Sequence, residues 1–487
     1  MLVEPLFGHA QNQPHCVAII DERAYTYEQF GAMVAALTTL IGTQTRRPRV
    51  GLLMPTGIGF ATSFYATLTA GKVAVPINFL LGDSEISHIV RDSGIDTIVT
   101  VPACASKVKD ALLNVLDFSA LPQPSFITSP KFPTPAPNDV AVIMYTSGTT
   151  RLPKGVKLSF ENIQSCVDAA IQHARLRGTH KFLGILPLFH STGLLATLVA
   201  PIQLGSSICY QARFSPLAAI KAIREQNISI VAAVPSMYGA ILRLKDVGPA
   251  DVKSLYAAIS GGEPLPIQIR DGWQQKFGIP IFEGYGLTET AGPIAFNIPG
   301  HIRLGSVGAL VPGASAKIVD ENGNTLPPGE IGEVWLRGPM ITKGYLNLPD
   351  ETTEAFSADG YLKSGDMGKL DQDGYLYITG RKKELISIAG EKVSPREIED
   401  ILMDHPAVFE AVVIGKSDIS RGQMVVAYVV PKEDQSPSPE ELRDFCRLRG
   451  LPQWKIPREI QIVHDLPRSP GGKVLKSELI AMASSKA

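Results

Sequence analysis

The sequence predicts an α/β fold with a large N-terminal domain of stacked sheets and helices, a β subdomain, and a small C-terminal α+β domain. Three observations support this prediction. The 487 residues exceed what one hydrophobic core usually organises. Short β-rich runs alternate with amphipathic stretches from residue 15 to about residue 285. Beyond residue 303 turns punctuate the pattern, and after Arg381 the alternation returns on a smaller scale.

The alternating region predicts parallel sheets covered by helices, because parallel strands need long crossover connections. We expect strands at 50–54, 97–101, 140–144, 182–186, 228–234 and 255–259, and helices at 63–70 and 162–174. A further helix should begin after Ser215, which stands as an N-cap before Pro216 and a run of apolar residues at helical spacing.

Residues 303–380 should form the β subdomain, because their alternating segments carry Asp, Asn and Gly at expected hairpin turns. Residues 381–487 should form the α+β domain, with helices at 395–403 and 439–447 and strands at 411–414, 424–430 and 460–463. The change from glycine to charged residues at 379–384 marks the boundary. We therefore expect domains at 1–380 and 381–487.

Composition restricts the partners and the compartment. The 46 basic and 47 acidic residues leave a formal net charge of −1 without a block of like charges, so nucleic acid is not an expected partner. The five cysteines are scattered without a C-x-x-C pair, which favours a reducing, cytoplasmic setting. No apolar run approaches the ~20 residues of a membrane span.

The most informative segment follows the apolar run 140–144. It reads Thr146, Ser147, Gly148, Thr149 and Thr150, with Lys154 close behind. Glycine allows backbone N–H groups to turn inward and the hydroxyls add donors, so the loop suits a triphosphate. It is not a Walker A motif, since G-x-x-x-x-G-K-[ST] is absent. The alternative is a polar surface turn.

Two later segments add groups that suit a nucleotide. In the segment 284–290, Tyr285 offers a face for a purine, Thr288 a hydroxyl for a phosphate, and Glu289 a carboxylate for Mg²⁺. The alternative there is a glycine turn with a solvated helix cap. Asp366 and Arg381 could together hold the two hydroxyls of a ribose. An exposed ion pair at a hairpin end is equally compatible with these residue types.

Two single residues are candidates on weaker grounds. His190 ends a predicted strand in an apolar neighbourhood, where a structural histidine is the alternative. Lys473 follows two glycines in a predicted flexible tip near the C-terminus, where it could equally be an ordinary surface lysine.

Taken in order, these segments resemble the adenylate-forming superfamily of acyl- and aryl-CoA synthetases. The matching motifs are T-S-G-T-T-x-x-P-K-G at 146–155, G-Y-G-x-T-E at 284–289, S-G-D at 364–366, G-R at 380–381 and G-K at 472–473. The resemblance spans nearly the whole chain. It implies a large domain that binds ATP and a carboxylic acid, and a small mobile lid that rotates about a hinge.

The resemblance also implies a role for each matched residue. The residues that would hold the β and γ phosphates are Thr146, Ser147, Gly148, Thr149, Thr150 and Lys154. The residues that would line the adenine slot are Gly262, Glu263, Pro264 and Tyr285. Thr288 would contact the α-phosphate, and Glu289 would hold Mg²⁺. The ribose would lie against Asp366 and Arg381, the hinge at Lys383, and Lys473 would bridge the substrate carboxylate and the α-phosphate.

One residue departs from the family pattern. Arg151 stands where the family usually has glycine, and a positive φ there would strain a non-glycine residue. We expect the loop to bind ATP nevertheless.

The implied reaction activates a carboxylic acid with MgATP as acyl-AMP, releases pyrophosphate, and transfers the acyl group to coenzyme A. Family analogy places the acid among small or neutral residues, namely His190, Ser191, Pro235, Ser236, Ser260, Gly261, Gly284 and Leu310. His190 replaces the aspartate with which amino-acid adenylation domains bind an ammonium, and no cation is evident for a second carboxylate. A fatty acid is therefore favoured, with an aryl acid close behind.

Three alternatives stay open. The acyl group could pass to an acyl carrier protein instead of coenzyme A. A luciferase-like oxygenase could use the same domains. The chain could also be a nucleotide-binding regulator that no longer turns over, although Lys473, Glu289 and Asp366 together argue against that.

Overall fold

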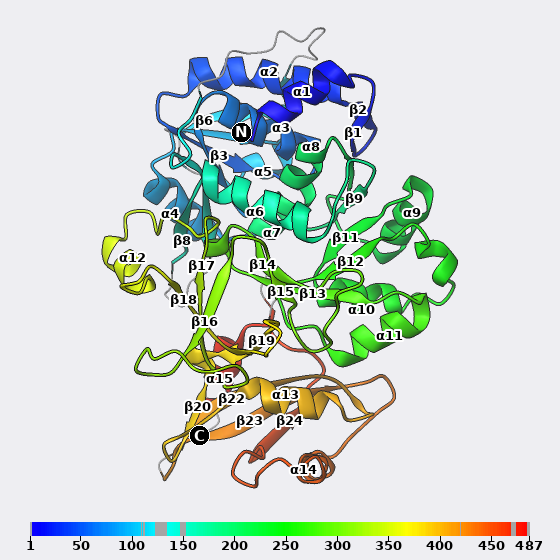
Figure 1. Ribbon diagram of the computed structural model, residues 1–487, viewed down its shortest axis with the longest axis vertical. Helices are drawn as coiled ribbons and strands as arrows, with labels where there is room; N and C mark the ends of the chain where they lie inside the picture. Colours follow the sequence, from blue (N-terminus) through cyan, green and yellow to red (C-terminus); the bar gives the residue numbers. More distant parts are fainter. Residues whose placement is uncertain are drawn as a thin grey trace.

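The computed structural model describes residues 2–108, 110, 113–121, 134–146, 152–418, 420–468 and 474–484. The strands in this part of the chain form four sheets (Figure 1). The two largest are formed by strands between residues 17 and 310, a third follows them in the sequence, and the C-terminal sheet lies at the lower end of the molecule. The α/β prediction, with a small C-terminal domain, is confirmed.

The first large sheet has nine strands, in the order β15 (Ala309–Leu310), β14 (Pro293–Phe296), β13 (Ile281–Gly286), β12 (Ala257–Ser260), β11 (Ile230–Ala233), β9 (Lys181–Gly184), β10 (Ser207–Tyr210), β1 (Val17–Ile20) and β2 (Ala24–Thr26). The second has six, in the order β6 (Asn114–Asp117), β5 (Thr97–Thr100), β3 (Arg49–Leu53), β4 (Val73–Pro76), β7 (Val140–Thr146) and β8 (Lys154–Ser159).

Helices cover both large sheets and fill the space between them. One buried core joins the two sheets through α1 (Glu4–Asn12), α2 (Tyr27–Gln44), α3 (Ile58–Thr69), α6 (Phe160–His173) and α8 (Ala200–Leu204). A separate core packs α4 (Asp83–Ser93) on the outer face of the six-stranded sheet. Another packs α9 (Pro216–Gln226), α10 (Pro235–Leu242) and α11 (Ile267–Phe277) on the nine-stranded sheet. The result is a five-layer sandwich.

The predicted parallel sheets carry antiparallel strands at their edges. The pairs β1–β2, β7–β8, β13–β14 and β14–β15 are antiparallel. Short connections join β1 to β2, β7 to β8 and β13 to β14, and a hairpin needs only a short turn, whereas a parallel pair needs a crossover. The helix after Ser215 does begin at Pro216, and the Ser215 hydroxyl accepts the Ala218 N–H at 3.5 Å.

The β subdomain begins later than expected. Its sheet consists of β16 (Ser315–Val319), β17 (Gly332–Arg337), β18 (Leu362–Leu370) and β19 (Leu376–Arg381). Residues 309–310 belong instead to the nine-stranded sheet as β15. The expected hairpin turn near residue 371 is present, since one Asp371 carboxylate oxygen accepts the N–H groups of Asp373 and Tyr375.

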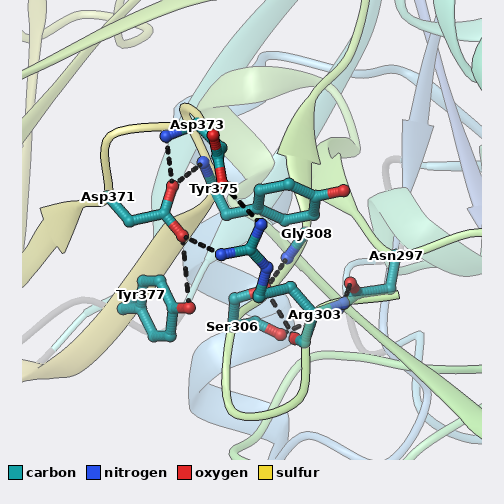
Figure 2. A network of polar contacts seen from close by, with 8 residues as sticks. All are labelled: Asn297, Arg303, Ser306, Gly308, Asp371, Asp373, Tyr375 and Tyr377. Atoms are coloured by element: carbon teal, nitrogen blue, oxygen red, sulfur yellow. Dashed lines mark hydrogen bonds and ion pairs between the residues drawn. The ribbon is translucent and has the colours of Figure 1, made fainter. Parts of the chain in front are cut away.

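Arg303 attaches this subdomain to the loop after β14. Figure 2 shows its guanidinium between Asp371, at 3.1 Å, and Asp373, at 2.6 Å. It also lies over the Tyr375 ring, 4.6 Å from the centroid. The Arg303 backbone N–H donates to Asn297 at 2.8 Å, so one residue joins two segments that are distant in sequence.

The C-terminal sheet contains β20 (Ile386–Ile388), β21 (Glu391–Val393), β22 (Val408–Asp418), β23 (Gly422–Pro431) and β24 (Glu459–Ile462). One face packs against α13 (Pro395–Met403) and α14 (Pro439–Leu448), and the other against α15 (Lys476–Ser484). The predicted bounds of α13 agree with the structure. Among the described residues, no helix has the length and apolar character needed to cross a membrane.

Candidate active site

The carboxyl ends of four neighbouring strands bring the predicted acid-pocket residues to one edge of the nine-stranded sheet. Strands β9, β11, β12 and β13 lie side by side and parallel. They lead into His190, Pro235, Gly261 and Gly284 or the segments around them. Ligands of open α/β sheets bind outside such strand ends. The Ser260 side chain at this edge is fully buried, and its hydroxyl has no hydrogen-bond partner among the described atoms.

Two glycines allow the chain to pack closely at this edge. A Cβ on Gly284 would lie 2.9 Å from the Cβ of Phe296, and one on Gly261 would lie 3.3 Å from the Gly284 carbonyl oxygen. Larger residues would push β13 away from its neighbours, so both positions favour glycine.

His190 stands at the N-terminus of the short helix α7 (Ser191–Leu194). Its ring packs edge-on against Phe189, with centroids 4.8 Å apart, and Phe189 packs in turn against Phe79. The His190 side chain is exposed to solvent on one side, and the protein packed around the rest of it lowers its pKa below the ordinary value by desolvation. The imidazole is therefore neutral at pH 7, able to form a hydrogen bond but not to supply a fixed positive charge.

The predicted phosphate loop lies in the sequence between two antiparallel strands. Thr146 at the end of β7 pairs with Lys154 at the start of β8. The predicted phosphate contacts Ser147, Gly148, Thr149 and Thr150 lie outside the described residues, as does Arg151. The Lys154 ammonium lies 5.7 Å from the centroid of the Tyr345 ring and has no ion-pair partner in the described part of the chain.

Glu289 lies in a single turn of 3₁₀ helix, Thr288–Thr290, directly after β13. Its Oε1 accepts the Tyr345 hydroxyl at 2.9 Å, and its backbone carbonyl accepts the Thr342 N–H at 2.7 Å. The side chain is half-buried and makes no ion pair with a described cation. Thr288, the predicted α-phosphate contact, is the neighbouring residue.

The donor set around Glu289 fits Mg²⁺. No cluster of three or more His, Cys, Asp or Glu side chains within the described ranges could form an all-protein cage for a metal. Mg²⁺ usually keeps several waters and binds one or two carboxylates together with substrate phosphates. A single half-buried carboxylate next to β8, the strand that follows the predicted phosphate loop, matches that preference.

The predicted ribose contacts meet in space. Asp366 and Arg381 are register partners on β18 and β19, and the Arg381 Nε lies 3.1 Å from the Asp366 Oδ1. The Tyr285 hydroxyl donates to the other carboxylate oxygen at 2.6 Å. Asp366 is only 3% exposed, whereas the Arg381 side chain is 41% exposed. Burial, followed by the Asp366 charge, raises the pKa of Tyr285, so its hydroxyl remains a donor.

The predicted adenine loop lies between β12 and α11. Gly262 has a φ of +84°, a left-handed conformation that favours glycine, and Glu263 and Pro264 follow it. The next residue, Leu265, donates its N–H to Glu283 Oε1 at 3.2 Å. Desolvation raises the pKa of the Glu283 carboxyl. Glu283 belongs to none of the motifs in the sequence and reads there simply as a strand residue.

The predicted hinge residue Lys383 is exposed in the short helix Lys382–Glu384. The adjacent Lys382 pairs with Glu333 of β17 at 2.8 Å. Further contacts between the C-terminal domain and the larger body join Gln268 to the Met403 carbonyl, and Arg243 to the Phe409 ring at 6.0 Å. Lys473 lies outside the described residues. The residues flanking its segment, Arg468 and Val474, form an antiparallel bridge.

Family models match both parts of the chain. The model for the AMP-binding enzyme matches residues 6–346, and the model for the AMP-binding enzyme C-terminal domain matches residues 397–473. The chain belongs to the AMP-binding enzyme family. It is therefore an adenylate-forming enzyme of the acid–thiol ligase class, and enzymes of this class use ATP, Mg²⁺ and coenzyme A.

Similar proteins act on different acids. A sulfoacetate–CoA ligase of Cupriavidus necator is 35% identical over 88% of this chain and 87% of its own length. A long-chain-fatty-acid–CoA ligase of Bacillus subtilis is 33% identical, with 89% and 85% covered. A fatty acid–[acyl-carrier-protein] ligase of Streptomyces coeruleorubidus is also 33% identical, with 98% and 95% covered. These relatives share a reaction type but differ in acid and acceptor.

Among solved structures, ATP-bound MatB from Rhodopseudomonas palustris superposes with a TM-score of 0.91 at 26% identity, covering 99% of both chains. The likeness therefore extends over the C-terminal domain as well as the larger body.

Proposed function

We propose that the enzyme converts a fatty acid to its coenzyme A thioester, with an aryl acid as the alternative substrate class. The carboxylate oxygen attacks the α-phosphorus of ATP and pyrophosphate leaves, giving acyl-AMP. The thiol of coenzyme A then attacks the acyl carbonyl, loses its proton, and AMP leaves. Both steps occur in one cleft if the lid changes its orientation between them.

The single observation that supports a neutral acid is the uncharged lining of the predicted pocket. None of its residues is acidic, lysine or arginine, and His190 is kept neutral by its surroundings. A malonate-like acid or a sulfonate would bring a second negative charge, whose burial without a cation is costly. A hydrocarbon chain or an aromatic ring carries no such cost.

We assign the nucleotide contacts as follows. Asp366 and Arg381 bind the ribose, and the Tyr285 ring forms one side of the adenine slot with Gly262, Glu263 and Pro264. Thr146, the loop 147–150 and Lys154 hold the β and γ phosphates, and Thr288 contacts the α-phosphate. Mg²⁺, when bound at Glu289, supplies positive charge against the charge that develops on the phosphates.

We further propose that residues 381–487 move as a lid about Lys383 and carry Lys473 into the cleft for adenylation. The ammonium of Lys473 would neutralise the attacking carboxylate and the α-phosphate, which otherwise repel each other. Rotation of the lid would withdraw this lysine and open a path for the thiol. All five cysteines are free, which supports the proposal of a reducing, cytoplasmic location.

The acceptor has a specific alternative. The Streptomyces relative is named as a ligase for an acyl carrier protein, so transfer to a carrier protein is the second candidate. It would use the same adenylation chemistry and differ only in the surface that receives the thiol.

A panel of acids with MgATP tests the proposal. It should contain fatty acids of increasing length, benzoate, cinnamate, malonate and sulfoacetate, and pyrophosphate and AMP should be measured with and without coenzyme A. The proposal expects CoA-dependent AMP formation that is highest with a fatty acid. Highest activity with malonate or sulfoacetate would refute the neutral-acid assignment. Accumulation of acyl-AMP in the presence of coenzyme A would favour a carrier protein as the acceptor. If no acid in the panel gave pyrophosphate or AMP, acid activation would be refuted.

A further inference from the structure

Tyr345 lies between the two charged groups that the proposed function assigns to the phosphates and the metal. Its hydroxyl donates to Glu289 Oε1 at 2.9 Å. The Lys154 ammonium lies 5.7 Å from the centroid of its ring. No family motif used above includes this residue, and its sequence context of glycine and apolar neighbours did not mark it.

The backbone around Tyr345 connects the strand after the phosphate loop to the Glu289 turn. Tyr345 forms an antiparallel bridge with Val156 of β8, and the Leu346 N–H donates to the Gly155 carbonyl at 2.7 Å. On the other side, the Thr342 N–H donates to the Glu289 carbonyl at 2.7 Å. The segment 342–346 therefore fixes the position of Glu289 relative to β8, the strand that follows the predicted phosphate loop.

Backbone contacts of this segment also fix the orientation of the Tyr345 side chain. The Tyr345 N–H donates to the Thr352 hydroxyl at 3.0 Å. Gly344 has a φ of +97°, and a Cβ on it would lie only 2.3 Å from the Thr352 Cγ2. Both features hold the backbone at 344–345 close to the helix α12 (Pro349–Ala355). The ring is thus placed by the backbone as well as by its own contacts.

The chemistry of the arrangement suits a metal site. A hydroxyl donor on Oε1 restrains the rotation of the Glu289 carboxylate, and Oε2 has no described hydrogen-bond partner. Partners of this kind orient metal ligands, and their loss typically weakens metal affinity about 10- to 100-fold.

The ring has a second effect. A lysine and a glutamate that both contact one tyrosine would attract each other, and a direct ion pair would cancel both charges before ATP arrived. The Tyr345 ring gives the ammonium an aromatic partner instead, through a cation–π contact. Lys154 and Glu289 consequently remain available for a phosphate and a cation.

We propose that Tyr345 is a positioning residue of the adenylation site, which aims the Glu289 carboxylate at Mg²⁺ and keeps Lys154 apart from it. The inference rests on the proposed metal role of Glu289. It does not depend on which acid the enzyme uses, nor on the acceptor.

Binding of ATP, measured by calorimetry in EDTA and in saturating Mg²⁺, tests this role without turnover. The ratio of the two dissociation constants reports how much Mg²⁺ strengthens the binding of ATP. By reciprocity, ATP strengthens the binding of Mg²⁺ by the same factor. For Tyr345→Phe we expect this ratio to fall about 10-fold or more, with little change in the affinity measured in EDTA. For Tyr345→Leu, which also removes the ring, the affinity in EDTA should fall as well, because Lys154 can then pair with Glu289.

Two comparison variants separate positioning from loss of structure. Tyr145→Phe deletes another hydroxyl beside the phosphate loop, one that donates to Asp92 at 2.7 Å, and should leave the ratio unchanged. In a Glu289→Gln background, Tyr345→Phe should have no further effect on the ratio.

Several outcomes would overturn the proposal. They are an unchanged ratio in Tyr345→Phe, an equal fall in Tyr145→Phe, or additive losses with Glu289→Gln. An unchanged ratio in Glu289→Gln alone would instead remove the premise that Glu289 holds the metal, while leaving the fatty-acid assignment to the acid panel.

Discussion

The ribose site offers the sharpest single test, through Asp366→Asn. The change keeps the size of the side chain and its ability to accept the Tyr285 hydroxyl, but removes the charge that pairs with Arg381. A hydrogen bond to a charged group contributes about 1.5–3 kcal/mol, against about 0.5–1.5 kcal/mol for a neutral pair. The difference is about 1–1.5 kcal/mol per bond.

Two ribose hydroxyls on one carboxylate therefore lose about 2–3 kcal/mol, which corresponds to a roughly 30- to 150-fold weaker affinity. Titration calorimetry with ATP, AMP and tripolyphosphate measures this loss. ATP and AMP should weaken together, and tripolyphosphate, which lacks ribose, should bind as it does to the unaltered enzyme. Unchanged ATP and AMP affinities would refute the ribose assignment. An equal loss for tripolyphosphate would show instead that the variant disturbs the site as a whole.

The remaining predictions concern the lid, the subdomain attachment and pH. Lys473→Ala should abolish adenylate formation but leave thioester formation from supplied acyl-AMP nearly intact in a coupled assay; equal loss of both half-reactions would contradict the lid-lysine role. Arg303→Lys keeps the charge but cannot bridge two aspartates at once (Figure 2), so its melting temperature should fall between those of the unaltered enzyme and Arg303→Met. An unchanged melting temperature in Arg303→Met would show that the network does not stabilise the fold. Desolvation lowers the pKa of His173, so the unfolded chain takes up this proton first and stability should be lost as the pH falls below about 6.5. Melting curves at about pH 7.5 and about pH 5.5 should show a smaller loss for His173→Gln, and an identical loss would exclude this histidine as a cause.

Local patterns in the sequence were sufficient for much of the fold. The helix that begins at Pro216 follows from an N-cap serine, a proline at the first turn and apolar spacing. The helix Pro395–Met403 follows from a proline at the first turn and apolar spacing. The helix Tyr27–Gln44 was not predicted. Its buried residues recur every three or four positions, but alanines, Met33 and Leu40 also stand on its other faces, so the contrast between the faces is weak in the sequence. The antiparallel edges were also missed, since strand direction depends on how the connections pack.

The nucleotide motifs likewise combine features that the sequence predicted with features that only the structure showed. Their residue types indicated a phosphate loop, a metal carboxylate and a ribose pair, because hydroxyls, carboxylates and a guanidinium have the chemistry those ligands need. That Tyr285 donates to Asp366, and that Glu289 accepts from Tyr345, became visible only in three dimensions.

The sequence by itself determined the family, the reaction type and the residues able to carry charge in it. Only the tertiary structure decided which of those residues meet, that Asp366 is buried while Arg381 keeps an exposed face, and that Tyr345 stands between Lys154 and Glu289. The physical reason is that chemical type and capping are local properties of the chain. Distances between residues separated by dozens of positions depend on how the sheets and the segments between them pack.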